Sequence, residues 1–164
     1  LVLQRRFEDV AQLVYECHDR SAHAIEACLL RAETSGGLGR DRLALFLRAA
    51  FAARRELGAF LPLQRPQGVP AAAIRALRDR DAGIRARLDR LLRRGERDGS
   101  LAVADREAAI ELVVGALYPP ATGRTALRRA EVDTAVAELL VRALAGEALA
   151  AGLSDPAPSV RPRR

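Results

Sequence analysis

The sequence predicts an all-α fold, a bundle of several packed helices, on three observations. Hydrophobic residues make up 49% of the 164 residues, and most of them are Ala and Leu, which are strong helix formers. Aromatic residues are only 4%, and no segment has the apolar–polar alternation of a β-strand. Apolar residues instead recur every three or four positions, which places them on one face of a helix.

The first predicted helix covers residues 1–34 and has a broad apolar face. Two adjoining hydrophobic stripes run along it, so we expect it to contact more than one neighbour. Their members include Leu3, Phe7, Val10, Val14, Tyr15, Cys17, His18, Ile25, Cys28 and Leu29. Glycines at 36, 37 and 39 then end the helix.

A second helix is predicted over residues 41–57. Asp41 is its expected N-cap, and Gly58 lies just past its end. Three prolines follow within residues 58–70, and this segment is predicted to be a loop.

The third predicted helix covers residues 70–98, beginning at Pro70 and ending before Gly99. Asp81 stands in its apolar seam where a Leu or Ile would be expected. Because a buried unpaired carboxylate is costly, Asp81 must be paired, solvated or facing a polar ligand. We expect a pair with Arg85, one turn further along.

Two more helices are predicted over residues 105–118 and 128–145. A pair of prolines follows the first, and Gly146 follows the second. Residues 151–164, rich in Ala, Gly, Pro and Arg, are predicted to form a flexible tail.

The net charge is +6, and every basic residue is arginine. Arginine outnumbers the acidic residues between 71 and 99, but oppositely charged residues there are spaced one helical turn apart. These pairs are Arg75–Asp79, Arg85–Asp89 and Asp89–Arg93. With no aromatic side chain among them, this pattern favours a solvated, salt-bridged face over a nucleic-acid surface.

The sequence has no signal-peptide pattern and no stretch near the roughly 20 apolar residues of a membrane span. Cys17 and Cys28 lie about 16 Å apart if they share one helix, too far for a disulfide. We therefore expect two buried thiols in a reducing compartment, the cytoplasm.

The order of these elements resembles the C-terminal domain of TetR-family transcription regulators. The resemblance covers residues 1–150 and lies in helix lengths and hydrophobic spacing. The segments that carry it are LVLQRRFEDVAQLV, RARLDRLLRRGERDGSL, AAIELVVGALYPPATG and RRAEVDTAVAELLVRALAG. It implies an effector-binding, dimerising domain of a bacterial repressor. Operator DNA would be bound only through a helix-turn-helix head before Leu1, which this chain lacks.

In that family the last two helices pair with their symmetry mates in a four-helix bundle. Both helices here carry apolar stripes, with small residues between them that allow close approach. The expected dimer interface is Ile110, Val113, Val114, Leu117, Val132, Val136, Leu139, Leu140 and Ala143. The alternative is that these stripes only fill the core of a single chain.

The resemblance also implies a small hydrophobic effector held between the long helices. Aromatic rings with a few polar groups make a typical small-molecule site. The expected lining is Tyr15, His18, Phe46, Phe51, Phe60, Leu88, Leu92 and Tyr118. For each phenylalanine, and for His18, ordinary core packing is the alternative.

No catalytic motif is present, and we expect neither an enzyme nor a bound cofactor or metal. Asp19, His23 and Glu26 share one helix face, but such a trio on a solvated surface usually forms ion pairs. The sequence thus favours a regulatory domain. A ligand-free helical interaction module is the alternative, and a metal-dependent helical enzyme has little support with only two histidines.

Overall fold

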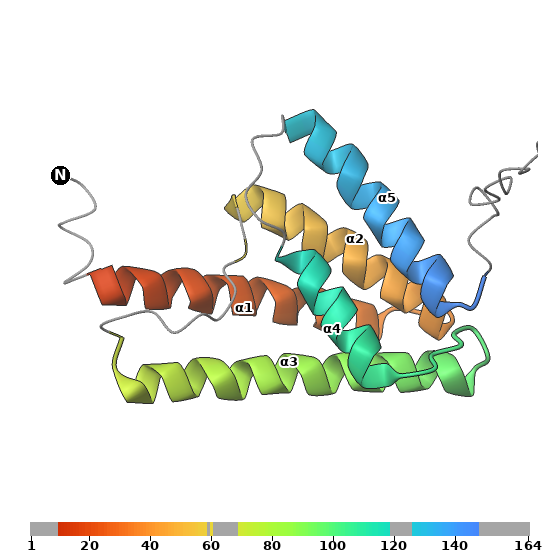
Figure 1. Ribbon diagram of the computed structural model, residues 1–164, viewed down its shortest axis with the longest axis horizontal. Helices are drawn as coiled ribbons and strands as arrows, with labels where there is room; N and C mark the ends of the chain where they lie inside the picture. Colours follow the sequence, from red (N-terminus) through yellow and green to blue (C-terminus); the bar gives the residue numbers. More distant parts are fainter. Residues whose placement is uncertain (1–9, 59, 61–68, 119–125, 148–164) are drawn as a thin grey trace, which may run out of the picture.

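The computed structural model describes residues 10–58, 60, 69–118 and 126–147, and within them the fold is all-helical, as predicted. The elements are α1 (Val10–Thr34), α2 (Gly39–Leu57), α3 (Ala71–Arg97), α4 (Arg106–Leu117) and α5 (Ala126–Leu144). The two longest helices, α1 and α3, lie side by side along the long axis (Figure 1). No described helix is both long and apolar enough to cross a membrane.

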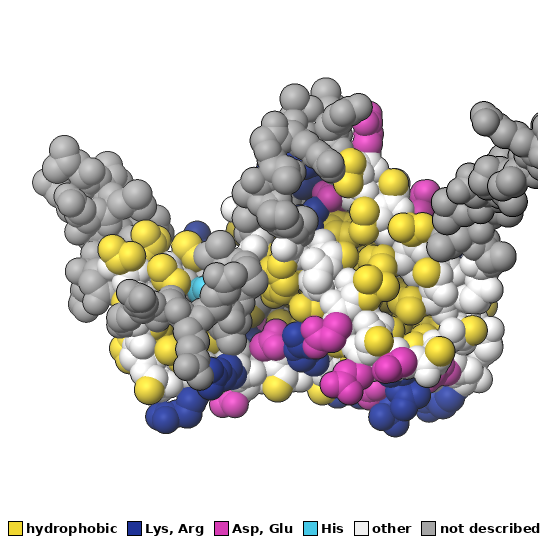
Figure 2. All heavy atoms as spheres, viewed as in Figure 1, with side chains coloured by type: hydrophobic (Ala, Val, Ile, Leu, Met, Phe, Trp, Pro, Cys, Tyr) yellow, Lys and Arg dark blue, Asp and Glu magenta, His cyan; other side chains and the backbone are white. Residues whose placement is uncertain are grey.

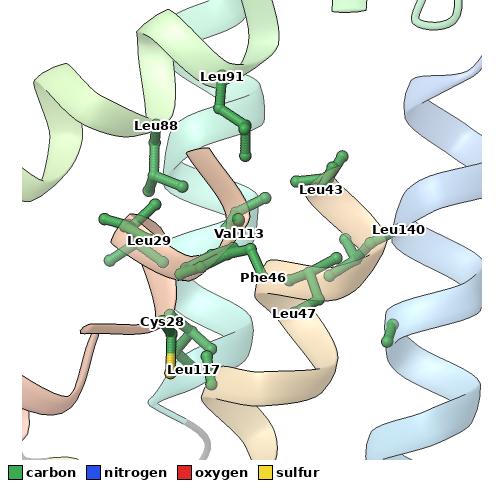
Figure 3. Packing of buried hydrophobic residues seen from close by; sticks show 14 of the residues in the cluster. Cys28, Leu29, Leu43, Phe46, Leu47, Leu88, Leu91, Val113, Leu117 and Leu140 are labelled. Carbon is green, nitrogen blue, oxygen red and sulfur yellow. The ribbon is translucent and has the colours of Figure 1, made fainter. Parts of the chain in front are cut away.

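Helix α2 is at the centre of the bundle and packs against α1, α3, α4 and α5. Its inward side chains Leu43, Phe46 and Leu47 are fully buried. Side chains from the other four helices surround Phe46 (Figure 3). Burying each large apolar side chain contributes about 1.5–3 kcal/mol, so this cluster is the main source of stability.

The helix boundaries agree closely with those expected from the sequence. α1 ends at Thr34 as predicted, while the first nine residues of the predicted helix, and the predicted tail, lie outside the described residues. Gly58 follows α2 with a φ of 86°, in the left-handed region that favours glycine. The Asp105 side chain caps α4 by accepting the Ala108 N–H at 3.1 Å.

The start of α2 differs from the prediction. The helix begins at Gly39, so Asp41 is not its N-cap but lies in its first turn, where it accepts the Leu38 N–H at 3.1 Å. The Gly39 N–H donates to the Asp98 carboxylate at 2.7 Å, and the Arg40 N–H donates to the Ser100 hydroxyl at 2.9 Å. The loop after α3 therefore caps α2, and no local sequence signal reports this.

A buried ion pair joins three helices. Arg54 of α2 and Asp133 of α5 form it, with side chains only 10% and 6% exposed. Arg54 also donates to the carbonyls of Ala116 and Leu117 at 3.0 and 3.2 Å, at the end of α4. These contacts fix α4 and α5 relative to α2, and so determine which of their side chains remain outside.

Candidate functional site

A small polar pocket lies between α1, α3 and the end of α4. Its volume is about 20 Å³, close to the room that one water molecule needs. It is lined by His18, Ser21, Ala22, Leu77, Asp81, Ile84 and Tyr118. We call this group the α1–α3 pocket.

The polar side chains His18 and Ser21 of the pocket come from α1, and Asp81 comes from α3. His18 is only 7% exposed, and Ser21, one turn later, donates its hydroxyl to the Cys17 carbonyl at 2.8 Å. Asp81 accepts from Arg85 Nε at 2.8 Å, which confirms the pairing expected from the sequence. The pocket therefore combines an imidazole, a hydroxyl and a carboxylate with apolar walls, as small-molecule sites do.

Tyr118 closes the pocket at the end of α4. Its ring packs edge-on against Phe60, with ring centroids 6.4 Å apart. Burial raises the pKa of the Tyr118 phenol, and the negative charge of Asp81 raises it further. The phenol therefore remains a neutral hydrogen-bond donor and acceptor beside the carboxylate.

The eight side chains predicted to line an effector site separate into two groups. His18 and Tyr118 line the α1–α3 pocket, Phe60 contacts Tyr118, and Tyr15 lies half-buried one turn before His18 on α1. The other four are buried in the hydrophobic core: Phe46, Phe51, Leu88 and Leu92. Their predicted contact with an effector stays a prediction, since in this structure they pack against one another and their neighbours.

Five lining residues were absent from the predicted set. Leu77, Asp81 and Ile84 belong to the seam of α3, and Ser21 and Ala22 lie three and four residues after His18 on the same helix face. The signal that could have found them is Asp81 itself, because a carboxylate interrupting an apolar seam needs polar surroundings.

The trio Asp19, His23 and Glu26 on α1 contacts an arginine of α3. Arg80 reaches across from α3 to Asp19 and Glu26, and it also hydrogen-bonds His23, so it lies among all three residues of the trio. No group of three possible metal ligands occurs among the described residues.

On α3 the Asp89–Arg93 pair forms as predicted, at 2.7 Å. The predicted Arg85–Asp89 pair is wrong. Arg85 binds Asp81 and Glu111 instead, and Asp89 binds Arg106 of α4. The predicted pair of Arg75 with Asp79 is also not formed within the described residues. Tertiary partners on α4 thus compete with neighbours on the same helix.

The residues predicted to form a dimer interface also fall into two groups. Val113, Val114, Leu117 and Leu140 are buried in the core of the single chain, where the alternative interpretation placed them. Ile110 and Val136 are half-buried. Val132, Leu139 and Ala143 are exposed, Leu139 by 50%. Only this last group is available to a partner in full.

The exposed surface formed by Val132, Leu139 and Ala143 continues onto α4, where Leu112 is 52% exposed and Gly115 is also exposed. On α5 the exposed stripe has spacings of three and four residues, and it includes the small residue Ala135. We call these residues, Leu112, Gly115, Val132, Ala135, Leu139 and Ala143, the α4–α5 face. Figure 2 shows hydrophobic side chains gathered over α4 and α5 on the side in view.

Comparison with known proteins gives no family model that matches the chain and no curated protein significantly similar to it.

Proposed function

We propose that this chain is the dimerising, effector-sensing domain of a TetR-type transcription regulator. The α4–α5 face is the observation that carries the proposal. Two large apolar side chains, Leu112 and Leu139, remain about half exposed on adjacent helices, and Val132 on α5 is also exposed. Small residues beside them let a second pair of helices approach closely, as in a two-fold four-helix bundle.

The oligomeric state tests the dimerisation step. Light scattering coupled to size exclusion should give twice the chain mass at micromolar concentration. Leu139→Glu should dissociate the dimer, because it places a charge at the centre of an apolar interface. Leu30→Glu on α1 is the matched control, since Leu30 is 55% exposed and lies outside the face. A monomeric chain, or equal dissociation by both variants, would contradict the proposal.

The sensing step uses the α1–α3 pocket. Its present volume admits about one water, so a small hydrophobic effector must enlarge it by moving α1 relative to α3. A bound effector would thereby bias the orientation of α1, the helix that in this family follows the DNA-binding head. The expected consequence in the full-length protein is release of operator DNA.

A screen of hydrophobic metabolites by thermal unfolding tests this step. A ligand that binds the folded state should raise the melting temperature. Tyr118→Leu should abolish the rise, because Tyr118 lines the pocket. Tyr15→Leu should retain the rise in melting temperature, since Tyr15 is not among the residues that line the pocket. No rise with any compound, or a rise unchanged in Tyr118→Leu, would count against the pocket.

The packed interior favours a second candidate, a helical interaction module without an effector. Phe46, Leu88 and Leu92, three of the predicted effector contacts, are at most 1% exposed and belong to the hydrophobic core. Under this candidate the α4–α5 face binds a different protein, and the chain alone is monomeric. The light-scattering experiment therefore separates the two candidates.

A further inference from the structure

The end of α1, the beginning of α2 and the end of α3 lie together at the opposite end of the bundle from Val10 (Figure 1). Residues of these three helix ends line another pocket. Its volume is about 180 Å³. It is lined by Glu33, Arg42, Arg90, Leu91, Arg94 and Arg97. Four of these six side chains are guanidinium groups, and only one is a carboxylate.

The single carboxylate is already neutralised. Arg87 donates to both oxygens of Glu33, with Nε–Oε1 and Nη2–Oε2 distances of 3.0 and 2.6 Å. This hydrogen bonding lowers the pKa of Glu33, so Glu33 is ionised and both of its carboxylate oxygens are paired with Arg87. The positive charge of the lining arginines is therefore not balanced by Glu33.

Two of the lining arginines act on carboxylates only through their charge: Arg90 helps to lower the pKa of Glu33, and Arg94 helps to lower the pKa of Asp98. Arg90 and Arg94 make no side-chain hydrogen bond or ion pair within the described part of the chain. Arg85, Arg93 and Arg106 on the neighbouring surface all bind carboxylates. Like charges one turn apart on a helix, such as Arg90 and Arg94, destabilise it.

Arg42 brings a buried cation to the same pocket. It is only 6% exposed, and it donates through Nε to the Gly37 carbonyl at 3.2 Å and through Nη1 to the Glu33 carbonyl. Its Nη2 has no hydrogen bond to another described residue. No side-chain nitrogen or oxygen of the described residues is both sealed from solvent and unbonded, so Nη2 is accessible to solvent, and Arg42 is one of the residues that line the pocket.

We infer that this pocket binds a phosphate group, held by Arg42 Nη2 from the buried side and by Arg90 and Arg94 from the rim. Guanidinium groups suit this ligand, because each presents paired N–H donors that match two phosphate oxygens. A dianion would also offset the repulsion between the two rim arginines. The helix dipole favours cations near the end of α3, and the carbonyls at the end of α1 hold Arg42, but these carbonyls bind only Nε and Nη1 and leave Nη2 for a ligand.

The site is independent of the proposed regulatory function. None of its residues belongs to the α4–α5 face or to the α1–α3 pocket. Dimerisation and effector binding can therefore fail without affecting phosphate binding, and phosphate binding can fail without affecting them.

Titration calorimetry with pyrophosphate, at ionic strength matched with sodium chloride, tests the inference. The chain should bind one pyrophosphate per protomer. Arg90→Gln/Arg94→Gln should weaken binding by at least about tenfold, since it removes two guanidinium groups that would form charged hydrogen bonds with the phosphate. Arg75→Gln/Arg78→Gln is the matched control, because it removes the same charge from exposed positions on the same helix. It should change the affinity by less than about twofold.

Further probes separate the possible sources of the phosphate group. If phenyl phosphate binds more tightly than inorganic phosphate, the ligand is an organic phosphate ester. If inorganic phosphate binds at least as tightly, the ligand is the free anion, and both results support the site. Equal loss in both double variants, or no binding of pyrophosphate at matched ionic strength, would overturn it. Circular dichroism of both variants checks that the helices remain intact.

Discussion

Gly39, the first residue of α2, lies directly against Gly95 in the last turns of α3. Both residues are buried. A Cβ built on Gly39 would overlap the Cα and N of Gly95, so the backbones of the two helices touch here. This contact lets the loop after α3 reach the first N–H groups of α2.

Replacing Gly39 with alanine should destabilise the fold by about 1–3 kcal/mol, because the added methyl group must push two backbones apart. Urea unfolding followed by circular dichroism measures the loss. Gly83→Ala is the matched control. Gly83 also lies in a helix, but a Cβ there meets nothing within 4 Å. Gly83→Ala should stabilise the chain by about 0.5–1 kcal/mol, and a loss at both positions would contradict the close contact.

The ion pair of Arg54 with Asp133 predicts a difference between two neighbouring arginines. Arg54 and Arg55 both bind Asp133, but their side chains are 10% and 35% exposed. Arg54→Met should cost about 2–3 kcal/mol, since it leaves two helix-end carbonyls without their donor and leaves the buried Asp133 carboxylate paired only with Arg55. Arg55→Met should cost at most about 1 kcal/mol, as an exposed pair does. Equal losses of stability in the two variants, measured by urea unfolding, would contradict the expected difference between Arg54 and Arg55.

The helices could be predicted because their signals are local. Periodic apolar residues set the faces, and glycines such as Gly58 set the ends. The cap of α2 could not be predicted, since Asp98 and Ser100 lie about sixty residues along the chain from the N–H groups they bind. The choice of Arg54 over Arg55 as the buried partner is likewise set by the packing of α5, which a helical periodicity does not reveal.

The candidate site was partly predictable. His18 could be placed on the apolar side of its helix, and Asp81 could be singled out as a misplaced carboxylate. Aromatic character alone, however, did not distinguish Tyr118, which lines the pocket, from Phe46, which is buried in the core. That distinction depends on how the helices pack against one another, which is determined only in the assembled bundle.

Asp98 predicts a pH dependence at the start of α2. Hydrogen bonds from the Ser100 hydroxyl and the Gly39 N–H lower the pKa of Asp98. A lowered pKa means that the folded state favours the carboxylate. The stabilisation is therefore present above the ordinary pKa, about 4, and is lost as the pH falls below it.

Ser100→Ala removes the largest of these contributions, so the pKa of Asp98 should move upward toward its ordinary value. Carboxyl carbon chemical shifts measured against pH would report the change. Ser35→Ala is the control, because Ser35 donates its hydroxyl to the Ala32 carbonyl and not to Asp98. An unchanged Asp98 titration in Ser100→Ala would show that the hydroxyl does not stabilise the carboxylate.

Tyr118 predicts a pH dependence of the opposite sign at the candidate site. Burial and the charge of Asp81 raise the pKa of its phenol, whereas the charge of Arg85 lowers it. The folded state thus favours the neutral phenol. Stability should be full below about pH 10 and should fall as the pH rises above it, because the unfolded chain releases the proton first.

Asp81→Asn removes the charge that opposes ionisation and also frees Arg85 from its partner on α3. Both changes favour the phenolate, so the pKa of Tyr118 should fall. Phenolate absorbance measured against pH gives this pKa, and Tyr118→Phe identifies the signal by removing it. Asp79→Asn is the matched control, since it makes the same charge change two residues away at an exposed position. An equal shift in both asparagine variants would mean that net charge, rather than the proximity of Asp81, sets the titration of Tyr118.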